Sequence, residues 1–97
     1  MSRGRCVACN GRGVHRHHVI YAQAVEREGG NVADDRNLVW VCFTCHGNHH
    51  GRSKPLDLGM LPDSVFEFAG QLLGPAGFDY LRRRYVGEDA RLEALLS

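Results

Sequence analysis

The stretch Val41–Gly51 reads VCFTCHGNHHG and carries two of the four cysteines and three of the six histidines of the chain. Cys42 and Cys45 have the Cys-x-x-Cys spacing that forms one edge of a tetrahedral zinc site. His46 and His50 stand four residues apart, and on a helix this spacing places both imidazoles on one face. The stretch therefore predicts one short element that serves two metal sites, one built from thiolates and one from imidazoles.

A second Cys-x-x-Cys pair, Cys6 and Cys9, stands near the N-terminus and completes a predicted four-thiolate set with Cys42 and Cys45. Such a zinc site is closed and contributes folding energy, which suits a chain of 97 residues with a limited core. A disulfide framework is the alternative, but paired knuckles beside a histidine cluster favour structural zinc. Reduced thiols in turn favour a cytoplasmic location.

Composition limits the classes of function. We expect neither a membrane span nor a secretory signal, because no long apolar run and no signal pattern is visible. Its formal net charge is +1, so a nucleic-acid surface would have to come from local clusters of arginine. All cysteines and histidines lie at or before position 50, which indicates that the chemistry resides in the N-terminal half.

The pattern of apolar and turn residues predicts an α+β chain. Residues 14–20 and 38–41 predict two strands, and residues 21–28 between them predict a short helix. Another helix should start near Cys45 and end by Gly51, because glycine can cap it there. We expect residues 1–54 to form a metal-binding core and residues 55–97 a helical extension packed on it, within a single domain.

The extension has its own start signal. Ser64-x-x-Glu67 predicts a capping box in front of an apolar helix. Two shorter helices are expected around residues 78–85 and 92–96, and their apolar residues are interpreted as packing residues.

His17 and His18 are the candidates for the remaining chemistry. On a regular strand they would face opposite sides, so both reach one site only if the strand bends or ends there. His17 with His46 and His50 would surround a divalent ion and leave positions open for water and substrate. Spacing leaves two alternatives open, because His15 shares the face of His17 and His49 is three residues from His46.

The order of these residues resembles the HNH endonucleases. The resemblance covers roughly residues 6–51 and rests on His17-His18, on Asp34-Asp35-Arg36-Asn37 and on the cysteine–histidine stretch that follows. It implies a ββα-metal, treble-clef-like zinc finger with a structural zinc on the cysteines. The predicted helix at residues 21–28 has no counterpart in that motif.

The resemblance also implies roles for single residues. His18 would be the general base, Asn37 would orient the base and its loop, and His46 would belong to the catalytic set as well as to the metal. His17 and His50, rather than His15 and His49, would complete the set of metal ligands. The divalent metal would be Mg²⁺, Mn²⁺, Ni²⁺ or Zn²⁺, and the products would carry 5′-phosphate and 3′-hydroxyl ends.

These roles agree with the chemistry of phosphodiester hydrolysis. A neutral imidazole suits removal of a proton from water, and a metal stabilises the leaving 3′ oxygen. His18 must stay off the metal and hold its other ring nitrogen against an acceptor, for which the side-chain or backbone carbonyl of Asn37 is the candidate.

A DNA-binding surface is expected from basic residues near the two metal sites. The candidates for backbone contact are Arg3, Arg5, Arg16, Arg52 and Lys54, and the run Arg82-Arg83-Arg84 cannot face one groove with all its members.

The sequence therefore predicts a metal-dependent DNA endonuclease that makes single- or double-strand breaks. Small proteins that it resembles occur in phages and prophages beside a terminase, which would place this one in genome packaging in the host cytoplasm. The alternative is a non-catalytic zinc module that binds DNA or protein, which would keep the cysteines but give no reason for the histidine pattern.

Overall fold

Two short antiparallel strands lie at the centre of the N-terminal half. The computed structural model describes residues 4–96, in which β1 (His15–His18) pairs with β2 (Leu38–Val41) so that His17 lies opposite Val39. β1 is shorter than the predicted strand at residues 14–20 because the chain leaves the sheet after His18. The amide of the next residue, Val19, donates a hydrogen bond to the carbonyl of Asn37 at 2.9 Å, in the turn that precedes β2.

In the chain, one helix lies between the two strands and another follows the second strand. α1 (Ala22–Arg27) matches the predicted helix at residues 21–28, and a 3₁₀ turn, η1 (Asp35–Asn37), leads into β2. α2 (Phe43–His50) follows β2 and begins two residues before the predicted start at Cys45. The reason is that Cys42 caps the helix, since its Sγ accepts a hydrogen bond from the Cys45 amide at 3.3 Å.

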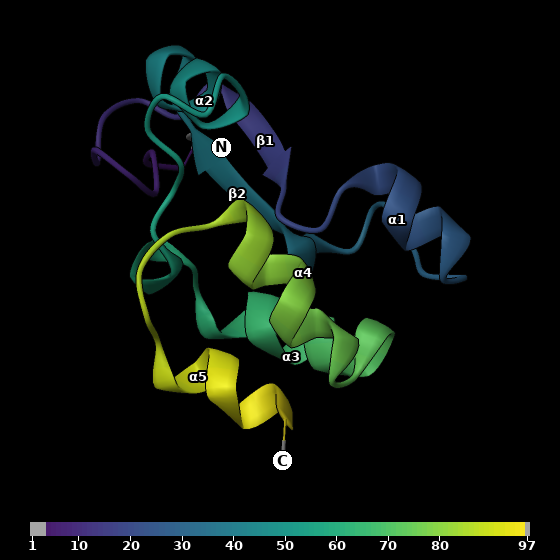
Figure 1. The fold of residues 1–97 in the computed structure, drawn as a ribbon. Helices are drawn as coiled ribbons and strands as arrows, with labels where there is room; N and C mark the ends of the chain where they lie inside the picture. The colour runs from purple at the N-terminus through teal and green to yellow at the C-terminus, as the bar shows by residue number, and fades with distance from the viewer. Residues whose placement is uncertain (1–3, 97) are drawn as a thin grey trace.

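The C-terminal half is helical, as predicted. It contains η2 (Leu58–Met60), α3 (Asp63–Leu73), α4 (Ala76–Arg84), α5 (Ala90–Glu93) and η3 (Ala94–Leu96). In Figure 1 the three α-helices gather below the sheet, at the end of the molecule away from α2. The predicted capping box is wrong, because α3 has Pro62 at its N-cap and Glu67 instead faces Arg36, 3.4 Å away.

One core joins the two halves. Its fully buried side chains come from the strand region and from the helices alike, and they include Val19, Ile20, Val25, Val41, Leu58, Leu61, Val65, Leu81 and Leu92. For the residues that it describes, the structure thus confirms a small mixed α+β fold with a two-stranded sheet and five α-helices, and the C-terminal helices share one core with the strand region. Within residues 4–96, none of the helices has the length and apolar character needed to cross a bilayer.

Candidate functional site

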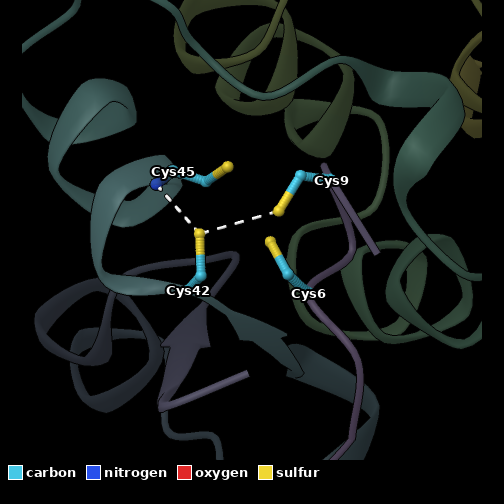
Figure 2. Close-up of side chains that lie close together, drawn as sticks. All are labelled: Cys6, Cys9, Cys42 and Cys45. Atoms are coloured by element: carbon cyan, nitrogen blue, oxygen red, sulfur yellow. Dashed lines mark hydrogen bonds between the residues drawn. The ribbon is translucent and has the colours of Figure 1, made fainter. Parts of the chain in front are cut away.

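The four cysteines come together at one side of α2. Cys6 and Cys9 lie on the N-terminal loop, Cys42 precedes α2 and Cys45 lies in its first turn, and Figure 2 shows their sulfur atoms pointing toward one another. All four sulfurs lie within 4.8 Å of each other, and all four residues are free thiols. The predicted convergence of the two knuckles is therefore present in the fold.

The spacing of the sulfurs suits a zinc ion. A tetrahedral site with Zn–S distances of about 2.3 Å has sulfur–sulfur edges of about 3.8 Å. The Sγ atoms of Cys9 and Cys42 are 3.7 Å apart, much farther than the length of a disulfide bond. The cluster can therefore hold a zinc ion with little rearrangement.

The thiols of this cluster differ in acidity. Burial, followed by hydrogen bonds to the other three sulfurs, raises the pKa of the Cys45 thiol to about 12. In Cys6 burial also acts to raise the pKa, but hydrogen bonds from backbone groups, the largest at Cys42, outweigh it and lower the pKa to about 6. Four thiolates this close need a cation among them, so metal binding would release protons.

Three histidines form a second cluster, separate from the cysteines. His17 reaches it from β1, and His46 and His50 reach it from successive turns of α2, with their ligand nitrogens all within 4.8 Å of each other. The Nε2 atoms of His46 and His50 are 3.0 Å apart. Two nitrogen ligands at about 2.0–2.1 Å from one ion are about 2.8–3.4 Å from each other, so the pair fits a shared metal.

The cluster lines a shallow hollow of about 290 Å³. The residues around it are Arg16, His17, His18, Tyr21, Ala22, His46 and His50. His17 and His18 both reach the hollow because β1 ends at His18, which is the condition that the sequence required. His50 is exposed and His46 half-buried at this hollow, whereas His17 is buried behind them.

Two histidines of the cluster, the buried His17 and the half-buried His46, have lowered pKa values. Burial, followed by the neighbouring histidines, lowers the pKa of His17 to about 3, and the same causes lower the pKa of His46. Because a metal binds the neutral imidazole, these side chains are already in the form that ligates an ion.

The two alternative ligands, His15 and His49, lie outside the group of ligand nitrogens. His15 is exposed and stacks on His46 with ring centroids 4.9 Å apart, outside the ligand group. His49 is buried, and its Nδ1 accepts a hydrogen bond from the Leu56 amide at 3.0 Å. Burial also lowers the pKa of His49 to about 4. The geometry therefore brings His17 and His50, rather than His15 and His49, to the cluster.

The prediction that a ring nitrogen of His18 is held by a carbonyl of Asn37 is wrong. Its Nε2 lies 3.0 Å from the carbonyl oxygen of Val32, not from Asn37. Asn37 is buried and uses its side chain to bond both backbone groups of Ile20, at 2.8 Å each. Asn37 thus holds the chain where it leaves β1, directly after His18.

Sequence reasoning missed two tyrosines at the cluster. Tyr85, at the end of α4, has its hydroxyl 2.9 Å from Nε2 of His17. Tyr21 lines the hollow, and its ring centroid is 5.9 Å from that of His50. The apolar pattern predicts that Tyr85 is a packing residue. A buried tyrosine hydroxyl normally has a hydrogen-bond partner, and this rule is the signal that points to a second role.

The basic residues proposed for DNA contact, apart from Arg3, have different neighbours in the structure. Arg5 pairs with Arg12 in a β-bridge, Arg16 lies 3.5 Å from Asp35 and 5.0 Å above the Trp40 ring, and Arg3 lies outside the described residues. Arg52 reaches the Arg83 carbonyl at 3.5 Å. Lys54 lines a separate hollow beside Cys9 and Cys45.

Comparisons of the chain with protein-family models, with curated proteins and with solved structures found no match. The functional interpretation therefore rests on the residues and geometry of the two clusters.

Proposed function

We propose that this protein is a metal-dependent endonuclease of the HNH type that hydrolyses DNA phosphodiester bonds. The observation that carries the proposal is the cluster of His17, His46 and His50 in an open hollow that His18 also lines. A structural zinc would sit among the cysteines, and a separate divalent ion among the three histidines.

His18 has the arrangement that a general base needs. A carbonyl oxygen only accepts hydrogen bonds, so the contact with Val32 requires a proton on Nε2 of His18. The lone pair of Nδ1 is then free to take a proton from a water molecule. Val32 thereby performs the orienting role that the sequence assigned to Asn37.

The three histidines would hold the metal. His17, His46 and His50 offer one nitrogen each, which leaves coordination positions for a phosphate oxygen and water. When bound, the ion would supply charge neutralisation at the phosphate and at the leaving 3′ oxygen. Asn37 would keep β1 and its following turn in register, so that His17 and His18 stay at the mouth of the hollow.

Plasmid nicking tests the proposal. Supercoiled DNA should be relaxed by the zinc-loaded protein when Mg²⁺, Mn²⁺, Ni²⁺ or Zn²⁺ is added and should stay intact in its absence. Failure with every ion would favour the rival function, a non-catalytic zinc module that needs only the cysteine cluster.

Loss of an α2 ligand should remove activity without loss of fold. His46→Ala and His50→Ala should each abolish nicking at a metal concentration that saturates the wild type, while circular dichroism and the cysteine-bound zinc remain unchanged. His15→Ala is the matched control, since it removes an imidazole that stacks on His46 from outside the ligand group.

His49→Ala should behave differently from His46→Ala and His50→Ala. It leaves the Leu56 amide without its acceptor, so we expect about 1–3 kcal/mol of lost stability with nicking retained. If His49→Ala abolished nicking and His50→Ala did not, the ligand pair on α2 would be His46 and His49.

A further hollow, along α4, would give the DNA strand a path. Arg27, Arg83 and Arg84 line this hollow of about 300 Å³ together with Ala76, Asp79 and Tyr80. Arg84 lies 3.8 Å above the Tyr80 ring and 5.5 Å above the Tyr21 ring, and Tyr21 belongs to the histidine hollow. Arg82 points elsewhere, toward Glu88 at 4.0 Å.

Arg83→Gln should therefore weaken DNA binding where Arg82→Gln does not. One lost phosphate contact should reduce the slope of log affinity against log salt by about 0.9. Fluorescence anisotropy of a short labelled duplex without divalent metal measures this slope for both variants. Equal slopes for Arg83→Gln and Arg82→Gln would show that α4 does not contact the backbone through Arg83.

A further inference from the structure

The hydroxyl group of Tyr85 lies between two groups from the end of β1. Tyr85 is 3% exposed, and its Oη is 2.7 Å from the carbonyl oxygen of Val19 and 2.9 Å from Nε2 of His17. Its ring stacks on His49 with a centroid separation of 4.9 Å. The side chain is thus held from two directions, and its oxygen has a defined place.

The direction of each hydrogen bond follows from the chemistry of the groups. A carbonyl oxygen only accepts, so the single hydroxyl hydrogen of Tyr85 goes to Val19. The Tyr85 oxygen can then only accept from His17, and this requires the proton of the neutral imidazole on Nε2. The nitrogen of His17 with a free lone pair is therefore Nδ1.

We propose that Tyr85 is a positioning residue for the histidine metal site: its hydroxyl fixes the tautomer and orientation of His17 so that Nδ1 is the ligating nitrogen. The inference rests on the metal site of the proposed function. Metal-ligating histidines commonly donate their second N–H to such a partner, and loss of that partner typically weakens metal binding 10–100-fold.

This arrangement gives the C-terminal helices a part in the site. Tyr85 follows α4, and Leu81 one turn earlier is fully buried in the shared core. The Tyr85 oxygen is therefore anchored by the packing of the helical half, although the ligands all come from the N-terminal half. His46 and His50, by contrast, are placed by α2 itself.

Tyr85→Phe removes only the hydroxyl and keeps the ring that stacks on His49. Calorimetric titration of the zinc-loaded Tyr85→Phe protein with Ni²⁺ should give an affinity at the histidine site about 10–100-fold below that of the wild type. Tyr80→Phe is the matched control on α4, because its hydroxyl accepts from the Tyr21 amide at 2.9 Å and lies off the metal histidines. We expect wild-type affinity for that variant.

The tautomer of His17 is a readout that general destabilisation would not change. Long-range ¹H–¹⁵N correlation spectra of the protein without the second metal should show His17 protonated on Nε2 in the wild type, and a mixture of tautomers in Tyr85→Phe. Protonation on Nδ1 in the wild type would overturn the inference, even if the variant failed to fold. Equal Ni²⁺ affinities for Tyr85→Phe and Tyr80→Phe would also overturn it.

These measurements separate the inference from the proposed function. A wild type that binds Ni²⁺ through Nε2-protonated His17 but cleaves no DNA would refute the nuclease and leave the role of Tyr85 intact. A wild type that cleaves DNA, with Tyr85→Phe unchanged in affinity and tautomer, would refute only the role of Tyr85.

Discussion

Replacing Cys42 by serine should leave most of the protein unfolded and without zinc. Cys42 lies at the N-cap of α2 and 3.7 Å from Cys9, so it joins the helix to the N-terminal loop. Structural zinc contributes about 10–16 kcal/mol in small zinc-finger peptides, which is comparable with the whole stability of about 5–15 kcal/mol of an ordinary domain. The stability lost with one thiolate should therefore be greater than the stability that this small core provides by itself.

Serine makes this substitution selective for the metal. A serine hydroxyl is among the best helix N-caps, so Cys42→Ser can keep the hydrogen bond to the Cys45 amide while losing the thiolate. Metal analysis should find about one zinc in the wild type and circular dichroism should show loss of helix in the variant. Zinc should refold the chelator-stripped wild type but not the variant. A folded, zinc-free Cys42→Ser protein would contradict the structural role.

Local patterns predicted the elements around the cysteines well. The β2 boundaries at residues 38–41 follow from a short run of apolar residues, and the end of the helix between the strands follows from glycine punctuation; both are short-range signals. The start of α2 was displaced because a cysteine acts there as the N-cap, and Cys42 had been interpreted only as a metal ligand. A residue with two roles is difficult to place from spacing alone.

Long-range contacts were the part that the sequence could not supply. Val32 and Tyr85 are 14 and 68 residues away from the histidines that they contact, and neither belongs to a spacing pattern. Asn37 is expected to orient His18 and its loop, but its side chain bonds Ile20 rather than His18. Glu67 fitted a capping box locally, yet the tertiary contact with Arg36 takes its carboxylate.

His18→Ala should lower the single-turnover rate of plasmid nicking by about 10²–10⁴-fold, the usual contribution of a positioned general base. The expected cause is loss of the Nδ1 lone pair, because His18 lines the hollow from beside the three-histidine cluster. Zinc content, Ni²⁺ affinity and DNA affinity should stay at wild-type values, since a base acts only in the chemical step.

His50→Ala is the comparator that distinguishes a base from a ligand. Both residues line the same hollow, but His50 belongs to the ligand group. Because a ligand also acts in the ground state, excess metal should partly restore nicking by His50→Ala and should leave His18→Ala slow. His17→Ala should respond to metal as His50→Ala does, with an added loss of stability because it also removes the partner of Tyr85. Rescue of His18→Ala by metal, without rescue of His17→Ala, would exchange their roles.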